Sequence, residues 1–480
     1  MKKRDLIALL LFVPAVVFAE PGNPPTGGPG MPPGDNSANI VFKGANVLSG
    51  NTIEEGKTYS SSSGGENTIL MESGKNELNK CKLEKSGDSN DENADFYGTN
   101  AAILVKSGTL SISGSSVKTN ALHANGIFAY ADGNIFISGT QIITSANNSG
   151  GIMVAGGGTI TASNCTVKTS GNSSAAIRSD RGGGNLTVNQ GTYESSGMGS
   201  PAVYSTANIV VNNAELTSTS AEGIVVEGKN SVTLNNSTLT DTNTTLNGNS
   251  ETYKNIFLYQ SMSGDAENDN ETAASTFTAK RSEITTNKGD TFFVTNTNAL
   301  IDLESNTITN NDGDFLRIQK GKWGKDGENG GNVTLNLTNQ EVKGNIVIDN
   351  ISTLDATIED GSIMAGSINS ENQAKEVTLN LSSDSVLSLT SDTYITSLKN
   401  ETKDNSNIYS NGKYKLYVNK KEIPINSSSY GDKTNSTKEN SVAKTNANYV
   451  YIFTLILLLL TLTILILLNK KRKKTRKRPQ

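Results

Sequence analysis

Short apolar segments that alternate with polar residues recur along the middle of the chain at an interval of about 24 residues. One kind of segment begins with a small residue, and its first apolar positions are Ile103, Ile127, Ile152, Ile177, Val203 and Ile224. The pattern continues more loosely at Ile256, Phe292, Leu316 and Ile346. Because alternation with a period of two puts every second side chain on one face, these segments are predicted to be β-strands.

A second pattern is stricter than the first. An apolar residue is followed, five positions later, by another, and Ser, Asn, Gly or Thr lie between them. Eleven such pairs begin at Ile112, Ile137, Ala162, Val188, Val211, Leu234, Ala279, Leu303, Leu337, Ile358 and Leu381. The polar spacers predict turns. Three short strands and three turns then fill each repeat, which is typical of one coil of a β-helix.

The repeats therefore predict an all-β fold, a right-handed parallel β-helix of about 11 coils over residues 38–424. One coil cannot bury its inner face, so neighbouring coils are expected to stack about 4.8 Å apart around a shared core. An array of β-sandwich domains is the alternative, but sandwich strands do not repeat one pattern at this interval. Segments 241–255, 260–275 and 319–332 interrupt the pattern and are expected to be loops.

The N-terminal end has a different composition. Residues 1–19 carry three basic residues and then an apolar stretch that ends at Ala19, which predicts a signal peptide cleaved before Glu20. A retained anchor is the alternative, but the apolar stretch is short and Pro14 interrupts it. Residues 20–37 hold most of the ten prolines and are expected to be a linker.

The C-terminal end predicts a membrane anchor. A polar stalk is expected over 425–447, and residues 448–468 are apolar and long enough to span a bilayer. The tail at 469–480 holds eight Lys or Arg, which marks the cytoplasmic side. We expect a single-pass protein of the cell membrane with its N-terminal ectodomain outside and residues 448–478 in contact with lipid. A buried helix and a nucleic-acid patch are the alternatives for these segments; no Leu-Pro-x-Thr-Gly sorting signal precedes the span.

Charge and composition narrow the range of partners. Without Lys2, Lys3, Arg4 and the eight tail charges the chain keeps 31 basic residues, and without Asp5 it keeps 46 acidic residues, a net charge near −15. Such a surface repels nucleic acid. Two cysteines, Cys81 and Cys165, do not make a disulfide framework. With one His and one Trp in the chain, we expect no metal or other cofactor.

The outer face of the first strand is the predicted ligand site. If the first apolar positions point inward, their neighbours point outward, and these neighbours are Leu104, Lys106, Phe128, Tyr130, Met153, Arg178, Asp180, Tyr204, Val225, Glu227, Phe257, Tyr259, Phe293, Arg317 and Gln319. Six of the chain's 26 Phe and Tyr residues lie on this stripe. Exposed apolar stripes mark binding surfaces, so we expect a glycan-binding groove. The alternative is a lateral core beneath the loops at 241–255 or 260–275.

The candidate ligand contacts are Arg178, Asp180, Tyr204, Glu227, Tyr259, Phe128 and Tyr130. We predict a non-catalytic adhesin or glycan-binding protein with no catalytic residues. A polysaccharide lyase or glycoside hydrolase that uses Asp180 and Glu227 is the alternative, since stacking places these carboxylates about 9–10 Å apart. A structural surface spacer is a third possibility. The lone His123 is expected to be a surface turn residue, and the Asp-rich segments 263–269 and 310–314 to be solvated turns instead of Ca²⁺ sites.

Five short sequence segments carry a resemblance to known proteins, in addition to the expectations drawn from the residues. They are DFYGTNAA at 95–102, RSDRGGG at 178–184, SPAVYST at 200–206, EGKNSV at 227–232 and YQSMSGD at 259–265. They resemble an uncharacterised family of surface proteins from gut Gram-positive bacteria of the Firmicutes type, which is labelled carbohydrate-binding or right-handed parallel β-helix repeat. The likeness covers about 40–420 and implies sugar binding by analogy.

Overall fold

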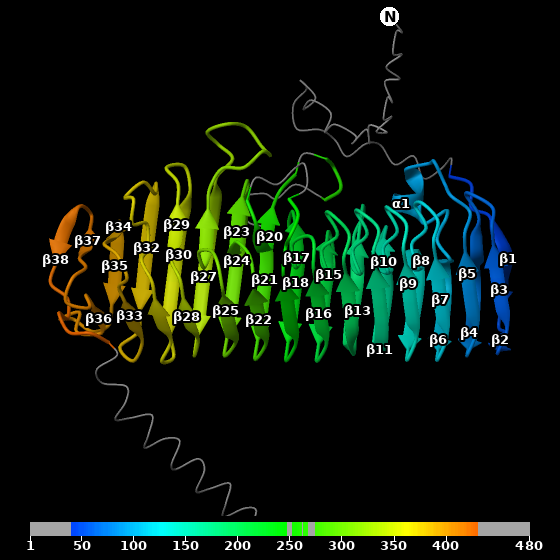
Figure 1. The fold of residues 1–480 in the computed structure, drawn as a ribbon, viewed down its shortest axis with the longest axis horizontal. Helices are drawn as coiled ribbons and strands as arrows, with labels where there is room; N and C mark the ends of the chain where they lie inside the picture. The colour runs from blue at the N-terminus through cyan, green and yellow to red at the C-terminus, as the bar shows by residue number, and fades with distance from the viewer. Residues whose placement is uncertain (1–39, 247–251, 262, 267–273, 431–480) are drawn as a thin grey trace, which may run out of the picture.

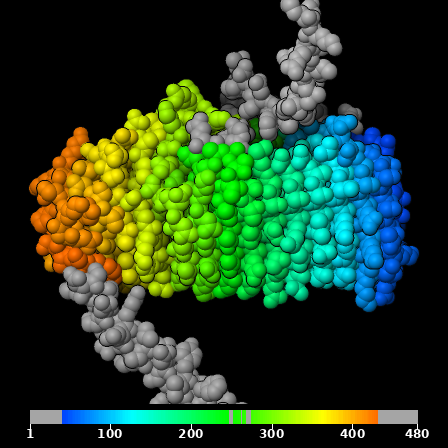
Figure 2. Space-filling model, viewed as in Figure 1, coloured from blue at the N-terminus to red at the C-terminus, as the bar shows by residue number. Residues whose placement is uncertain are grey.

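Strands stack along one axis in this chain. A computed structural model describes residues 40–246, 252–261, 263–266 and 274–430. They form a parallel β-solenoid of about 14 turns, an elongated body in Figures 1 and 2. The helix in this part of the chain is the short α1 (Asn93–Tyr97). Nearly every turn contributes a strand to each of three faces, which we call the first, second and third face; one turn has an isolated bridge at Ile368 in place of its first-face strand.

The first face carries the predicted site. Its strands are β1 (Gly44–Gly50), the first part of β4 (Asn67–Asn79), β6 (Ile103–Ser113) and β8 (Ile127–Ser138), then β10 (Ile152–Ala155), β12 (Ile177–Ser179), β14 (Val203–Ser205), β17 (Ile224–Glu227), β20 (Lys254–Tyr259), β23 (Asp290–Thr295), β26 (Leu316–Ile318), β29 (Ile346–Ile348), β34 (Thr393–Ile395) and β37 (Leu416–Val418). The hairpin strand β38 (Lys421–Ile423) pairs antiparallel with β37.

The second face follows each first-face strand. It consists of β2 (Ile53–Glu55), the later parts of β4, β6 and β8, the first parts of β11 (Gly158–Thr169) and β13 (Gly184–Ser195), and β15 (Asn208–Asn212), β18 (Ser231–Asn235), β21 (Ser275–Lys280), β24 (Thr297–Glu304), β27 (Gly331–Thr338), β30 (Thr353–Glu359), β32 (Glu376–Leu381) and β35 (Ser397–Asn400).

The third face closes each turn. It consists of β3 (Thr58–Ser61), β5 (Lys82–Lys85), β7 (Ser116–Thr119), β9 (Gln141–Thr144), the later parts of β11 and β13, and β16 (Glu215–Ser218), β19 (Thr238–Asp241), β22 (Glu283–Thr286), β25 (Thr307–Asn310), β28 (Glu341–Lys343), β31 (Ile363–Ala365), β33 (Val386–Ser388) and β36 (Ile408–Tyr409).

The inner side chains form the core that the repeat predicts. Ile127, Ile152 and Ile177 lie in register on consecutive turns, and all three are fully buried. The same register continues through Ile256 and Phe292. Because one turn shields the next, the burial of these side chains depends on stacking and not on any single turn.

The five-residue spacing has a physical cause in the bend between the second and third faces. In the bend from Leu234 to Leu239, Asn236 has φ 48°, a left-handed conformation that Asn tolerates better than most residues. The next residue, Ser237, is buried, and its Oγ accepts the backbone N–H of Ala214 on the previous turn at 3.2 Å. The left-handed residue therefore bends the chain at this corner, and the buried hydroxyl links this turn to the previous one.

The number of turns in the structure corrects the number that the sequence predicts. The sequence predicts about 11 coils, but the structure has about 14. The bend from Leu78 to Leu83 has the same spacing and adds one turn. The first turn lacks the apolar pair, because Glu54 takes the inner position next to Leu78. In their described parts, segments 241–255, 260–275 and 319–332 lie mostly between strands, as predicted, although their ends belong to the neighbouring strands. The right-handed sense of the coil stays a prediction.

The predicted signal peptide, linker, membrane span and basic tail lie outside the described residues, as does most of the stalk. Within the described residues, no helix has the length and apolar character that a membrane crossing requires. Cys81 and Cys165 are buried free thiols.

Candidate ligand-binding site

The outward side chains of the first face form a continuous ladder. Phe128 lies in register with Met153, Met153 with Arg178, and Arg178 with Tyr204. The ladder continues from Tyr204 through Val225, Phe257, Phe293 and Arg317. The predicted stripe therefore exists as one row, and what covers it decides which part a ligand can reach.

The N-terminal part of the row, which we call the apolar section, is a lateral core. It consists of the buried residues Leu70, Leu104, Phe128 and Met153 with Ala101 and Ala155. Phe42 and Tyr130 pack against it, with ring centroids 6.1 Å apart. Phe128 has no exposed surface. Phe128 and Tyr130 therefore lie in or against a lateral core, but the alternative placed such a core beneath the loops at 241–255 or 260–275 and not beneath α1. A ligand-binding role for these two residues stays a prediction.

The helix α1 covers this section. The ring of Tyr97 meets that of Tyr130 edge-on, with centroids 5.7 Å apart. Gly98 ends the helix at φ 70°, and a Cβ there would lie 2.8 Å from the ring of Phe128. Glycine satisfies both demands, the left-handed backbone and the close approach.

His123 is more buried than predicted. It lies in a turn, as expected, but only 12% of its side chain is exposed. Its Nδ1 lies 3.1 Å from Oδ2 of Asp95 in α1, and this contact raises the pKa of His123. The expectation of a surface residue was wrong because α1 folds back over the turn, so His123 joins the helix to the solenoid.

An ion pair begins the next part of the row. Arg178 donates from Nη2 to Oδ2 of Asp180 at 3.0 Å, and the backbone N–H of Arg181 donates to Oδ1 of Asp180. Burial raises the pKa of Asp180 to about 7, against the lowering effect of Arg178. Both oxygens of this carboxyl group are therefore occupied by the chain itself.

Arg181 joins two distant segments above the row. Its guanidinium lies 3.6 Å from the ring centroid of Phe96 in α1. Its Nε donates to Oδ1 of Asp265, which is 84 positions later in the chain, at 3.0 Å. The helix and the loop after β20 are thus held over the same stretch of the first face.

Glu227 is the centre of a hydroxyl cluster. Tyr204 and Tyr259 both donate to its Oε2, at 2.5 and 2.8 Å, and Ser261 donates to its Oε1. Glu227 is buried, and burial raises its pKa, while the bonds from Ser261 and the two tyrosines act in the opposite direction. These bonds bring three of the predicted contact residues together.

A group of aromatic rings, the aromatic cluster, adjoins Glu227. The rings of Phe257 and Tyr259 stack 4.3 Å apart at an interplanar angle of 10°. Phe293 meets Phe257 edge-on at 5.7 Å, and Trp323 lies 6.4 Å from Tyr259. Phe257, Tyr259 and Trp323 are partly exposed, unlike Phe128. Tyr130 at the other end of the row is also partly exposed, but here three partly exposed rings lie together.

Charged groups border the aromatic cluster. The Nζ of Lys254 lies 4.5 Å from the ring centroid of Phe257 and 3.1 Å from Oε1 of Glu222. Arg317 donates to both Asp290 and Asp314 at 2.6 Å. Ion pairs therefore border the rings, and Lys254 and Asp290, one member of each pair, lie in register on neighbouring strands.

Trp323 is the site residue that sequence reasoning missed. It lies in the loop between β26 and β27, and its carbonyl accepts a hydrogen bond from Asn329 at 3.0 Å. Asn296 connects this region to the loop after β20 by donating to the carbonyl of Gln260 at 2.7 Å. A single Trp inside a segment that breaks the repeat is a signal that such a loop carries function.

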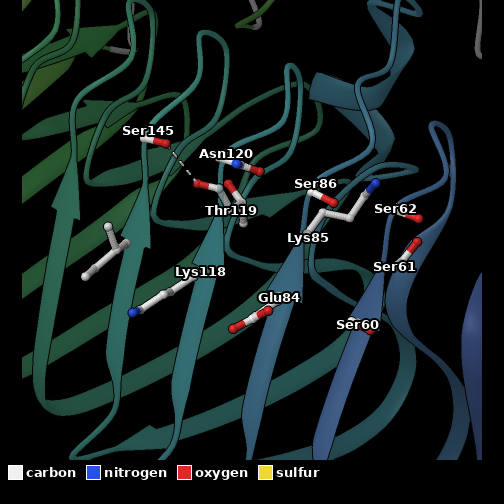
Figure 3. A pocket seen from close by; sticks show the side chains of 11 residues that line it. Ser60, Ser61, Ser62, Glu84, Lys85, Ser86, Lys118, Thr119, Asn120 and Ser145 are labelled. Atoms are coloured by element: carbon white, nitrogen blue, oxygen red, sulfur yellow. Dashed lines mark hydrogen bonds between the residues drawn. The ribbon is translucent and has the colours of Figure 1, made fainter.

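The third face has a shallow groove of about 540 Å³. Figure 3 shows that its walls are the ends of neighbouring strands, and the lining residues are Ser60, Ser61, Ser62, Glu84, Lys85, Ser86, Lys118, Thr119, Asn120, Ile143 and Ser145. Lys85 is buried and donates to the carbonyls of Ser63 and Gly87. No aromatic ring lines this groove, so it offers no stacking surface.

The described residues contain no group of three or more His, Cys, Asp or Glu side chains placed to hold a metal ion. In segment 310–314, Asp314 pairs with Arg317, and Oδ2 of Asp312 accepts the backbone N–H of Gly289. The acidic groups of that segment serve turn and strand contacts.

Comparison of the chain with protein-family models, with curated proteins and with solved structures finds no match in any of the three.

Proposed function

We propose that this chain is a non-catalytic surface protein whose β-solenoid binds glycan at the aromatic cluster. One observation carries the proposal: the outward row of the first face is buried under α1 but offers partly exposed rings at Phe257, Tyr259 and Trp323. Tyrosine and tryptophan combine a flat apolar body with a polar edge, which suits a sugar ring that has an apolar face and hydroxyl groups at its rim.

The environment of the carboxyl groups supports binding over cleavage. Asp180 is paired with Arg178, and both oxygens of Glu227 accept hydroxyl hydrogen bonds. A general acid or base must reach the substrate's proton within hydrogen-bond distance. Since these two groups are buried and occupied, we favour roles for them in positioning Tyr204 and Tyr259.

Surface display completes the proposal. The predicted signal peptide, the apolar span at 448–468 and the basic tail place the solenoid outside the cell on a single C-terminal anchor. A rod of about 14 turns at about 4.8 Å each extends roughly 65 Å. In this proposal the rod presents the aromatic cluster on the outer side of the membrane.

A glycan array probed with the purified full-length chain tests the proposal. We expect binding to at least one glycan class and its loss in Trp323→Ala and Tyr259→Ala. Phe136→Ala is the matched control, because Phe136 is an exposed aromatic on the second face, 45% exposed. Absence of binding to any glycan, or equal binding by all three variants, contradicts the proposal. Release of reducing ends or unsaturated sugars would show an enzyme instead.

A further inference from the structure

The two ends of the solenoid differ in how their last strands are paired. At one end lie β1, β2 and β3, and in the described part of the chain each of them pairs with a strand on one side only. At the other end lies the hairpin of β37 and β38, as Figure 1 shows. A strand paired on one side presents a row of free backbone N–H and C=O groups.

The edge of β1 has one of the usual protections, a register shift between Leu48 and Ser49, and lacks two others. Its seven residues include no charged residue and no proline, the devices that keep edge strands from pairing. Val47 is 51% exposed and lies in register with Leu70, the first residue of the apolar section. Val41 and Ile53, 67% and 70% exposed, lie close by in sequence. The lateral core thus ends in an exposed apolar residue.

The opposite end does not match this edge. The reversal of direction at β38 replaces a parallel edge with a hairpin, whose exposed residues Lys421 and Glu422 are charged. Head-to-tail stacking of two copies would place these charges against Val47. The N-terminal edge therefore has no complement at the C-terminal end.

Charge and chemistry favour a second N-terminal edge as the occupant. Residues 40–61 contain Lys43 and Lys57 against Glu54 and Glu55, so this end is neutral although the ectodomain is strongly acidic. Two copies can approach at this end without the repulsion of their other surfaces. Among the preceding residues, Pro21, Pro24, Pro25, Pro29, Pro32 and Pro33 lack the N–H that strand pairing needs, which disfavours pairing of residues 20–33 with β1.

We propose that two copies of the chain associate end to end through β1. A two-fold axis perpendicular to the rods sets β1 antiparallel to the same strand of the second copy, which joins the free backbone groups of both edges. Glu54 of the neighbouring strand β2 forms an ion pair with Lys57, and charged side chains keep an edge strand from pairing. We therefore choose β1 as the contact strand. In a membrane-anchored protein this contact joins the ends of the rods distal to the C-terminal anchors. The association does not depend on glycan binding.

Sedimentation equilibrium of the full-length chain in detergent tests this contact. We expect a concentration-dependent dimer whose dissociation constant rises about tenfold or more in Val47→Lys, equal to about 1.4 kcal/mol or more. Ala45→Lys, a second exposed position on β1, is expected to act in the same way. Phe136→Lys is the control, an exposed residue on the second face that leaves the dimer intact. Circular dichroism confirms that each variant is folded.

Hydrogen exchange of residues 44–50 separates the other outcomes. We expect protection that grows with protein concentration and is lost in Val47→Lys. A monomeric chain overturns the proposal: with protected 44–50 it shows that the chain's own N-terminal segment covers the edge, and with unprotected 44–50 that the edge stays open. A dimer that survives both lysine variants also overturns it, because the copies then meet elsewhere.

Discussion

The apolar section and the aromatic cluster occupy the same row of the first face, yet they differ in how much aromatic surface they expose to solvent. Phe128 is fully buried under α1, whereas Phe257 and Tyr259 keep part of their surface exposed. Phe128 and Phe257 are both aromatic, and both lie on the same outward row of paired strands. The difference shows that strand register decides where a side chain points, while the segments laid over the strand decide whether a ligand can reach it.

The largest expected effect comes from the apolar section. Phe128→Ala should lower the free energy of unfolding by about 3–5 kcal/mol, since it empties a packed site beneath α1. Phe136→Ala, which removes an exposed ring, should change it by less than about 0.5 kcal/mol. Denaturant unfolding followed by circular dichroism measures both. Equal effects would mean that the apolar section is not packed.

An intermediate effect is expected at the hydroxyl cluster. Glu227→Ala leaves the hydroxyls of Tyr204, Tyr259 and Ser261 without their acceptor and should destabilise the chain by about 1.5–3 kcal/mol. Tyr259→Phe removes one of these donors. In a double-mutant cycle the two changes should be coupled by about 0.5 kcal/mol or more. Strict additivity would show that the cluster does not act as one network.

The stability that depends on Asp180 should vary with pH, whereas the stability contributed by the apolar section should not. The pKa of Asp180 is about 7 in the fold, above its ordinary 3.8, so the folded state holds a proton that the unfolded state has released. This contribution to stability is complete below about pH 4 and is lost as the pH rises towards 7. Asp180→Asn should reduce the decline by up to about 1.4 kcal/mol per pH unit. Phe128→Ala should leave the slope unchanged, and an unchanged slope in Asp180→Asn contradicts the assignment.

The smallest expected effect on stability is that of Trp323→Ala. Trp323 lies in a loop and is partly exposed, so its removal should cost less than about 1 kcal/mol by thermal unfolding. The same change should abolish glycan binding. A large loss of stability would place Trp323 in the core and remove the contrast between the two sections.

The fold was predictable because its determinants are local and repeated. Most of these bends contain a left-handed residue such as Asn236, often followed by a small buried residue such as Ser237, and this local geometry favours the five-residue spacing. The outward row follows from alternation alone. The first turn was missed because its inner position Glu54 breaks the pattern, whereas the bend from Leu78 to Leu83 keeps the pattern and was overlooked.

The sequence did not predict which segments cover the row, because the contacts of these segments do not follow the sequence repeat. Arg181 meets Phe96 and Asp265, residues from two segments far apart in the chain. Nothing in the spacing of α1 or of the loop after β20 indicates that they meet at one arginine. For the same reason Trp323 stood outside the candidate set, although its loop brings it to Tyr259.

The fluorescence of Trp323 tests the central claim most directly, because Trp323 is the chain's only tryptophan. We predict that titration of the full-length chain with the glycan it binds on the array changes this emission saturably, with the same dissociation constant that calorimetry gives. Tyr259→Ala should weaken both signals together. Calorimetric binding without any change in Trp323 emission would contradict the account, since the glycan would then occupy another surface of the solenoid.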